Sequence, residues 1–443
     1  MVVEAWLARA AAARPEHPAL LAPEGDWSYA ELHAAARSGA GELFARGAGR
    51  GSRVAIALPA GRAFAQAMHA CMLLGAVAVP VDLRLSTAER SIVEGGASVV
   101  VEEPLARSGG ATAPAGASAR HDLDATAAII HTSGTSASPR PIALTYGNFL
   151  WSALGSAVAL GRDPGDRWLC ALPLSHVGGL SILVRSAIYA TTAVVHERFE
   201  VDRVITALQE QQVTLVSLVA TTLARLLDAG LGAPPALRCA LAGGGPVPGE
   251  LVARARAASV PVSLTYGLTE ACSQVTTTPV AAAGGECMDA GPPLFCTRVR
   301  IAADGEILVQ GPTVAPAARA GDGWLHTGDI GSVGEDGGLL VTGRKADTII
   351  SGGENVAPAE VEAVLEAHPH VLEAAVLGRR DPRWGEAVTA IVVAREGAEL
   401  DGEELRAHCA AALAPYKVPK RYVLAAEPLP RTRSGKLLRR ALQ

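Results

Sequence analysis

The feature that most constrains the fold is a regular alternation of short apolar runs with helical patterns between about residues 50 and 280. The runs RVAIALP (53–59), AVAVPVD (76–82) and TAVVH (192–196) are rich in β-branched residues, which favours buried strands. Segments between such runs, for example AFAQAMHACMLLG (63–75), have the length and apolar content of buried helices. This alternation predicts an α/β fold of mostly parallel, helix-covered sheets, with ligands at the carboxyl ends of the strands.

The pattern changes at about residue 285. From there to residue 343, short alternating strands are joined by three Asp-Gly dipeptides, which are typical of hairpin turns. This segment predicts a small antiparallel β-barrel attached to the α/β body. Helical patterns over 358–371 and 401–413 then alternate with apolar strands. We therefore predict a large N-terminal domain over residues 1–345, including the barrel over 285–343, and a smaller mobile α+β domain over residues 346–443.

Composition excludes several classes of protein. Hydrophobic residues make up 49% of the 443 residues and charged residues 19%, which excludes a disordered chain. The net charge of −5 and an aromatic content of 4% argue against binding of nucleic acid. The apolar stretch from Ala65 to Val81 is interrupted by Gln66, His69 and Pro80, and the N-terminus lacks an apolar signal core. We predict a cytoplasmic enzyme without membrane insertion, and the sequence leaves open whether it forms a homo-oligomer.

Lysine and cysteine usage adds two observations. The seven cysteines are scattered and form no C-x-x-C pair, so neither a disulfide framework nor a zinc knuckle is suggested. Lysines are rare in this arginine-rich chain and all lie near its C-terminus, at Lys345, Lys417, Lys420 and Lys436. Such positions are candidates for chemistry that needs a compact ammonium group, although chance explains the clustering equally well on its own.

A loop rich in hydroxyl residues follows the predicted strand ATAAII (125–130). Its residues offer hydroxyl donors and approachable backbone amides for a polyphosphate, and they are Thr132, Ser133, Gly134, Thr135 and Ser136. The Walker A pattern is absent, and loops of this composition are commonly ordinary turns.

Other chemistry-bearing segments also follow predicted strands. They are LPLSHVGGLSIL (172–183), LAGGGPVP (241–248), SLTYGLTEACSQ (263–274), GWLHTGDIG (323–331), TGRKADTIISGGENVAPAEVE (342–362) and LPRTRSGKLLRR (429–440). A lone histidine such as His176 is usually structural, whereas three glycines permit backbone to lie flat against a planar ligand. We expect Asp329 to be presented in a turn.

The order and spacing of YGLTE, HTGDIG, GRKADTIISGGEN and PRTRSGK resemble the adenylate-forming superfamily, which includes acyl-CoA synthetases, luciferases and peptide-synthetase adenylation domains. The resemblance covers essentially the whole chain. LPLSHVGGLSILVRSAIYA, VTLVSLVATTLARLLD and YGLTEACSQVTTT look most like the o-succinylbenzoate–CoA ligases of menaquinone biosynthesis. The resemblance implies a ligase that uses ATP, Mg²⁺ and coenzyme A to convert a small carboxylic acid first to an acyl-adenylate and then to a thioester.

The resemblance also implies roles for single residues toward the nucleotide. Residues 132–136 would wrap the β- and γ-phosphates, Glu270 would hold Mg²⁺, and Thr269 would bond the α-phosphate. Asp329 and Arg344 would bind the ribose. The adenine would lie between Tyr266-Gly267 and the backbone of Gly243, Gly244 and Gly245.

Further roles concern the two half-reactions and the acid. Lys436 would bridge the reacting carboxylate and the α-phosphate, and Gly352 and Gly353 would let the pantetheine arm of coenzyme A pass once the C-terminal domain rotates. The predicted acid-binding wall comprises His176, Gly178, Gly179, Ser181 and Leu264. We also count His176 among the predicted catalytic residues, with Lys436, Glu270 and Thr269. Arg185 lies four residues after Ser181 on the same helical face, and we hypothesise that it binds a spectator carboxylate; a solvent-facing arginine is an equal alternative.

The chain departs from the family pattern in its phosphate loop and at its hinge. The loop reads Ser136-Ala137 and Arg140-Pro141 in place of the usual glycine and lysine-glycine, which puts ATP affinity in doubt. The hinge position is Ala346, a residue without a side chain for a salt bridge that would hold one conformation. Two alternatives therefore stay open: a synthetase for another acyl or aryl acid, and a catalytically degraded nucleotide-binding homologue. The presence of Lys436, Glu270 and Asp329 argues against degradation.

Overall fold

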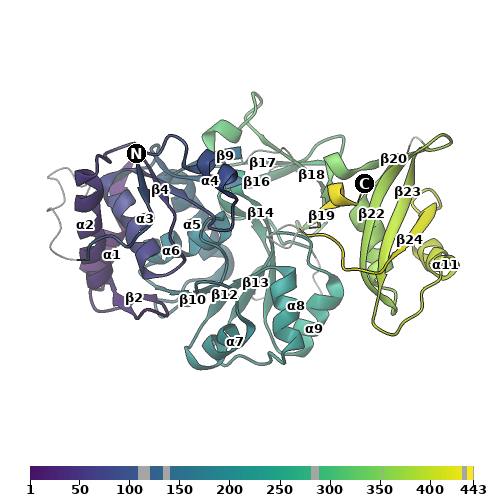
Figure 1. Ribbon diagram of the computed structural model, residues 1–443, viewed down its shortest axis with the longest axis horizontal. Helices are drawn as coiled ribbons and strands as arrows, with labels where there is room; N and C mark the ends of the chain where they lie inside the picture. The colour runs from purple at the N-terminus through teal and green to yellow at the C-terminus, as the bar shows by residue number, and fades with distance from the viewer. Residues whose placement is uncertain (108–119, 133–139, 281–288, 353, 432–436, 443) are drawn as a thin grey trace.

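The computed structural model describes residues 1–443 except 108–119, 133–139, 281–288, 353, 432–436 and 443. Two sheets and their helices build the large body on the left of Figure 1, and the C-terminal lobe lies at the right. A third sheet lies between them. In the part of the chain that is described, no helix is both long enough and apolar enough to cross a membrane.

The first sheet of the body has five strands in the order β6-β4-β5-β8-β9, and only the last pair is antiparallel. The strands are β4 (Arg53–Ile56), β5 (Val77–Pro80), β6 (Val99–Val101), β8 (Thr126–Thr132) and β9 (Arg140–Thr145). The accompanying helices are α2 (Tyr29–Ala45), α3 (Arg62–Leu74) and α4 (Thr87–Glu94). Every residue of α3 from Phe64 to Leu74 is buried, as its apolar sequence predicts.

The second sheet has eight strands in the order β15-β14-β13-β12-β10-β11-β2-β3, parallel except at its two edges. The strands are β2 (Pro18–Leu21), β3 (Trp27–Ser28), β10 (Arg167–Cys170), β11 (Thr192–Val195), β12 (Leu215–Leu218), β13 (Cys239–Ala242), β14 (Val262–Leu268) and β15 (Ser273–Thr277). The helices are α1 (Trp6–Ala13), α5 (Tyr146–Leu160), α6 (Val177–Tyr189), α7 (Val201–Glu210), α8 (Ala220–Asp228) and α9 (Gly249–Ala257). The predicted α/β fold with mostly parallel sheets is confirmed.

Strand β10 shows how the helices cover both faces of the second sheet. Trp168 and Cys170 belong to the core that also contains residues of the first sheet, α3 and α6. Leu169 points the other way, into a core formed with α7, α8 and α9. Successive side chains of a strand alternate between faces, so a continuous apolar run is what a doubly covered strand requires.

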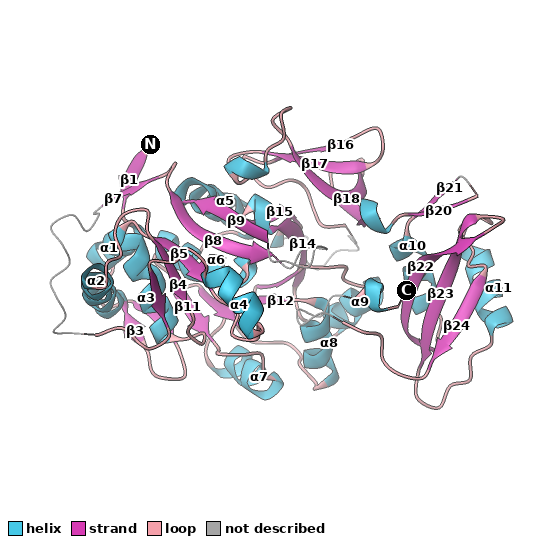
Figure 2. Cartoon of the chain, turned by 45° about the horizontal axis from the view of Figure 1, so that its top comes forward, coloured by secondary structure: helices cyan, strands magenta, loops and turns pink. Residues whose placement is uncertain are grey.

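The third sheet is antiparallel and open, with the order β16-β17-β18-β19. Its strands are β16 (Arg298–Ile301), β17 (Glu306–Gln310), β18 (Leu325–Val333) and β19 (Leu339–Arg344). The predicted barrel segment is therefore a half-barrel, and it connects the body to the C-terminal lobe (Figure 2). The expectation that Asp329 lies in a turn is wrong: Asp329 lies inside β18, opposite Arg344 of β19.

The C-terminal lobe has its own sheet and its own core. Its strands are β20 (Ile349–Ser351), β21 (Glu354–Val356), β22 (Val371–Asp381), β23 (Gly385–Ala394) and β24 (Arg421–Ala425), and its helices are α10 (Pro358–Glu366) and α11 (Gly402–Ala412). A short 3₁₀ turn, η4 (Lys345–Asp347), separates β19 from β20. The division into domains at residues 345 and 346 stays a prediction.

A glutamate at the end of α10 makes the stability of this lobe depend on pH. Burial raises the pKa of Glu366 to about 7, and the neighbouring carboxylates of Glu362 and Glu373 add to the shift, although the Ala374 amide and Arg431 oppose it. The folded lobe therefore binds more protons than the unfolded chain between pH 4.5 and 7, so stability is lost as pH rises through this range. Glu366→Gln, which cannot ionise, is expected to stabilise the lobe by about 1–2 kcal/mol at pH 8 and by little at pH 4.5.

Denaturant unfolding of the full chain at the two pH values measures this difference. Glu396→Gln is the matched control, because Glu396 is an exposed glutamate of the same lobe. An equal effect of Glu366→Gln at both pH values would contradict the prediction.

Candidate nucleotide- and acid-binding site

Three residues that the sequence analysis assigned to the nucleotide meet where the second sheet adjoins the half-barrel. The hydroxyl of Tyr266 donates a hydrogen bond of 2.7 Å to Asp329 Oδ2, and Arg344 Nε lies 2.7 Å from Asp329 Oδ1. Asp329 is only 5% exposed. Burial and the adjacent Asp329 carboxylate raise the pKa of Tyr266, which keeps its hydroxyl a donor. Both carboxylate oxygens are thus held in fixed positions, and each keeps a lone pair for a further donor such as a diol hydroxyl.

The three glycines after β13 lie beside this group. A Cβ atom at Gly243 would lie 2.6 Å from both Cγ2 and the carbonyl oxygen of Thr265, the residue before Tyr266. Only glycine permits this close approach of β13 to β14. Gly244 has a φ of +78°, and Gly244 and Gly245 are exposed. The glycines therefore present bare backbone beside β14, and their role as one wall of a planar-ligand site stays a prediction.

Thr269 and Glu270 lie in the 3₁₀ turn η1 (Thr269–Ala271), directly after β14 at the carboxyl edge of the second sheet. Both are half-buried, and the Glu270 carbonyl accepts a hydrogen bond of 2.8 Å from the Ala315 amide, which fixes the turn. Among the residues that the structure describes, the Glu270 carboxylate forms no ion pair. A half-buried carboxylate in that state suits a hard divalent cation such as Mg²⁺.

The phosphate loop is described only at its two ends. Thr132 ends β8 and its hydroxyl donates a hydrogen bond of 3.4 Å to the Arg140 carbonyl at the start of β9. The predicted phosphate-binding residues Ser133, Gly134, Thr135 and Ser136 lie outside the described residues. The atypical Arg140-Pro141 pair occupies the exposed first positions of β9.

The residues of the predicted acid-binding wall lie at the start of helix α6, except Leu264 on β14, and they differ in exposure. His176 and Gly178 are half-buried at the start of the helix, whereas Ser181 and Leu264 are buried. Gly179 is required by packing, because a Cβ there would lie 2.6 Å from the Pro173 carbonyl oxygen.

Arg185 is buried, so the alternative of a solvent-facing arginine is wrong: the residue is 3% exposed. Its guanidinium lies 4.9 Å from the ring centre of Trp168, and Nη2 donates a hydrogen bond of 3.4 Å to Ser152 Oγ. Ser152 Oγ in turn donates to the Cys272 carbonyl at 2.7 Å, just after η1. Within the described residues Arg185 pairs with no carboxylate, and its Nε has no hydrogen-bond partner. Burial lowers the pKa of Arg185, yet arginine stays charged at neutral pH.

Sequence reasoning missed two partners of this arginine, Trp168 and Ser152. They come from β10 and α5, and no local motif marks either of them. Only the packing of α6 between these elements brings them to Arg185.

Residues assigned to coenzyme A and to adenylation are described in part. Gly352 has a φ of +62° and its amide donates a hydrogen bond of 2.8 Å to the Trp384 carbonyl, so the turn itself requires glycine. Gly353 and Lys436 lie outside the described residues.

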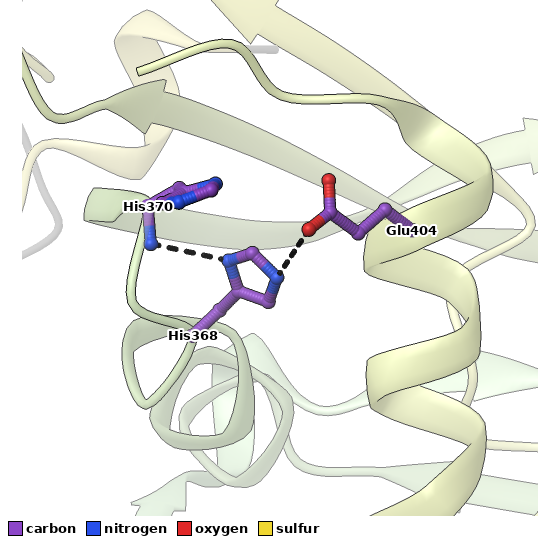
Figure 3. Close-up of side chains that lie close together, drawn as sticks. All are labelled: His368, His370 and Glu404. Carbon is purple, nitrogen blue, oxygen red and sulfur yellow. Dashed lines mark hydrogen bonds and ion pairs between the residues drawn. The ribbon is translucent and has the colours of Figure 1, made fainter. Parts of the chain in front are cut away.

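A further cluster of titratable side chains on the C-terminal lobe contains His368, His370 and Glu404 (Figure 3). His368 Nδ1 accepts a hydrogen bond from the His370 amide, and His368 Nε2 lies 3.3 Å from Glu404 Oε1. With Nδ1 accepting, Nε2 carries the proton and donates to Glu404. Metal coordination through Nε2 needs the opposite tautomer. We therefore assign the cluster a structural role, which is to hold the end of α10 against α11.

The fold and the candidate site together point to a class of protein: a two-lobed α/β enzyme whose candidate nucleotide site lies at the carboxyl edge of a parallel sheet. Family comparison agrees. Residues 7–317 match the family described as AMP-binding enzyme, and residues 360–436 match the AMP-binding enzyme C-terminal domain. The chain belongs to the AMP-binding enzyme family.

The chain is also similar to one particular group within this family. It is 38% identical to the 2-succinylbenzoate–CoA ligase of Bacillus subtilis, over 99% of this chain and 97% of the relative. The o-succinylbenzoate CoA synthetase of Bacillus subtilis in complex with the acyl-adenylate intermediate OSB-AMP has a TM-score of 0.90 at 36% identity, covering 100% of this chain and 98% of that one.

Two other structures of the Bacillus subtilis synthetase allow the overall arrangement to be compared with two liganded forms. The complex with ATP and a magnesium ion has a TM-score of 0.89 at 36% identity, covering 100% of both chains. A double mutant bound to the product analogue OSB-NCoA has a TM-score of only 0.74 at 37% identity, covering 100% of this chain and 99% of that one. The overall arrangement here is therefore closer to the nucleotide-bound form of the relative than to the form with the product analogue.

Proposed function

We propose that the protein is an AMP-forming acid–thiol ligase that converts o-succinylbenzoate to o-succinylbenzoyl-CoA in menaquinone biosynthesis. In the first step a carboxylate oxygen attacks the α-phosphorus of ATP, and pyrophosphate leaves. In the second step the thiolate of coenzyme A attacks the acyl carbon, and AMP leaves. The observation that carries the proposal is the full-length similarity to 2-succinylbenzoate–CoA ligase. Both ATP and coenzyme A are supplied in the cytoplasm, where we place the reaction.

The first step brings negative groups together, so positioning and fixed positive charge lower its barrier most. Asp329, held by Tyr266 and Arg344, would accept hydrogen bonds from both ribose hydroxyls. Glu270 would hold Mg²⁺, which supplies charge neutralisation to the phosphates when bound. Thr269, in the same turn as Glu270, would donate to the α-phosphate.

In this proposal Lys436 serves the first step and the SGGEN segment (351–355) serves the second. The ammonium group of Lys436 would lie against the oxygens that join the carboxylate to the α-phosphate in the first step. Rotation of the C-terminal lobe would then withdraw Lys436 and bring Gly352 and Gly353 to the pantetheine arm of coenzyme A.

The acid substrate carries a second carboxylate that does not react, and Arg185 suits it. A buried cation without a carboxylate partner is costly unless a ligand supplies the opposite charge. Arg185 is such a cation as far as the described part of the chain shows, and the hydrogen-bonded pair Ser152 and Cys272 connects it to the turn that carries Glu270. We propose that the spectator carboxylate pairs with this guanidinium.

Arg185→Met is expected to lower kcat/KM for o-succinylbenzoate by about 10²-fold, since a charge-assisted bidentate pair would be lost. With a monocarboxylic analogue that lacks the benzoate carboxylate, the same substitution is expected to change kcat/KM by less than about threefold. Arg238→Met is the matched control. Arg238 is a partly buried arginine just before β13 that pairs with Asp166 at 2.7 Å, and its loss should leave the ratio between the acids unchanged. Equal losses on both acids in Arg185→Met would exclude the assignment.

Release of pyrophosphate across a panel of acids tests the proposed function itself. With o-succinylbenzoate and ATP alone, we expect pyrophosphate in an amount close to that of the enzyme, because the adenylate stays bound. Added coenzyme A should give continuous turnover with equal amounts of AMP and thioester. A higher kcat/KM for another acid would identify a different acyl- or aryl-CoA synthetase, and nucleotide binding without pyrophosphate release would identify a degraded homologue.

A further inference from the structure

Three of the four consecutive residues 344–347, where the half-barrel ends, are attached through their side chains to different parts of the molecule. Arg344 pairs with Asp329 on the neighbouring strand β18. Lys345 reaches back to the β16–β17 hairpin, where its ammonium lies 2.7 Å from Asp304 and 3.0 Å from Glu306. Asp347 faces the C-terminal lobe instead. Ala346, between them, has no side chain that could attach to either side.

Glu306 is the buried residue of this group and joins two parts of the half-barrel. Its side chain is 8% exposed, and Oε2 accepts from Lys345. Its other oxygen, Oε1, accepts a hydrogen bond of 2.9 Å from the amide of Gly328, the residue before Asp329. Burial by itself would raise the pKa of Glu306, but the Lys345 ammonium and the Gly328 amide lower it overall, so the carboxylate stays charged at neutral pH. One side chain therefore connects Lys345 to the strand segment that carries Asp329.

On the other side of Ala346, Asp347 is attached to the C-terminal lobe. Asp347 Oδ2 lies 3.4 Å from Arg439 Nε. The same guanidinium makes a bidentate pair with Glu362 of α10 and donates a hydrogen bond of 2.9 Å to the Val376 carbonyl of β22. Asp347 is thereby joined to the helix and the sheet of the lobe.

We propose that Glu306 is a positioning residue for the ligase reaction. It attaches Lys345, on the body side of the pivot, to the strand segment that carries Asp329. The inference rests on the proposed function, in which the lobe rotates between the two steps. With Lys345 fixed to the body and Asp347 to the lobe, backbone rotation is confined to Ala346 and its two flanking bonds. A pivot confined in this way returns the lobe to the same place over the nucleotide in each cycle, which positioning catalysis requires.

Two substitutions separate the ion pair from the rest of Glu306. Glu306→Gln keeps a carbonyl oxygen for the Gly328 amide but removes the charge that binds Lys345. Lys345→Met removes the same pair from the other side, together with the pair to Asp304. Each is expected to slow adenylate formation and thioester formation by about three- to tenfold, with KM for ATP changed less than about twofold, since the Asp329 strand is retained. The double variant should be no slower than Lys345→Met alone, because that substitution already removes the Glu306 pair together with the Asp304 pair.

Lys417→Met is the matched control, because Lys417 also makes a short ion pair, at 2.5 Å to Glu360, but within the lobe. It should leave both rates unchanged. Rates that stay unchanged in Glu306→Gln and Lys345→Met would overturn the proposal. So would a double variant whose loss equals the product of the single losses.

Hydrogen exchange of the full chain supplies a readout that does not need activity. The amide of Thr348 donates to the Lys345 carbonyl at 3.3 Å, so its exchange reports on the pivot. We expect faster exchange of residues 345–351 in both single variants and not in Lys417→Met. Unchanged exchange in both variants would contradict the proposal that the Glu306–Lys345 pair fixes the pivot, even if the enzyme is active. A wild-type protein that activates no acid would disprove the proposed function and leave this test intact.

Discussion

Replacing Lys436 by alanine is expected to slow acyl-adenylate formation by about 10²–10³-fold, the loss typical of removing one group that stabilises charge in a transition state. The ammonium is proposed to contact oxygens on which negative charge accumulates as the carboxylate attacks phosphorus. Thioester formation from preformed adenylate should change much less, because the rotated lobe has then withdrawn this lysine. Single-turnover release of pyrophosphate measures the first step, and mixing enzyme-bound adenylate with coenzyme A measures the second.

The control for this experiment is Lys417→Ala, which removes another lysine of the same lobe and should leave both steps unaltered. Lys436→Arg adds a test of geometry. A planar guanidinium carries the same charge but a different shape, so only partial recovery of the first step is expected. If Lys436→Ala slows both steps equally, the division of work between two orientations of the lobe is wrong for this protein.

The alternating strands and helices could be predicted from sequence, because an element that is buried on both faces has a continuous run of apolar residues. In strand β10 the apolar run Trp168–Cys170 alternates between two cores, and α3 is buried from Phe64 to Leu74 and mostly apolar there. Irregular positions within strands could not be predicted from such a pattern. Asp329 was expected in a turn, yet its pairing with Arg344 of β19 keeps it within a strand. The irregularity of this segment appears instead as register shifts along β18 and as a φ of +71° at Gly328.

Contacts between distant segments could not be predicted in the same way. Tyr266 and Asp329 are hydrogen-bonded across 63 positions of sequence, and only the junction of two sheets brings them together. The hinge shows a similar limit. The sequence analysis considered only Ala346 there, whereas the adjacent Lys345 and Asp347 make ion pairs that it did not expect. The burial of Arg185 likewise depends on α5 and β10, which no pattern within α6 reveals.

The second large effect is expected at Asp329, where one carboxylate serves four partners in the proposed complex. Asp329→Asn keeps the size of the side chain but leaves one acceptor oxygen for Tyr266, Arg344 and two ribose hydroxyls. ATP affinity should fall by about 10²-fold, since at least one charge-assisted hydrogen bond to the ribose is lost and a second is weakened. Because the ribose is held equally in both states of the reaction, the loss should appear as a higher KM for ATP, with kcat changed much less.

A comparison of nucleotides separates loss of the ribose contact from general damage to the site. With the wild-type enzyme, 2′-deoxy-ATP should bind roughly tenfold more weakly than ATP, because one donor to Asp329 is missing. In Asp329→Asn the same change of nucleotide should cost less than about threefold, since the contact is already impaired. Tyr266→Phe is the matched control: it removes the hydroxyl that fixes Oδ2 but retains the ring and the carboxylate, so preference for the ribose form should persist. If 2′-deoxy-ATP is disfavoured equally by the wild type and by Asp329→Asn, the carboxylate does not hold the ribose, and its contacts with Tyr266 and Arg344 serve only to join the two sheets.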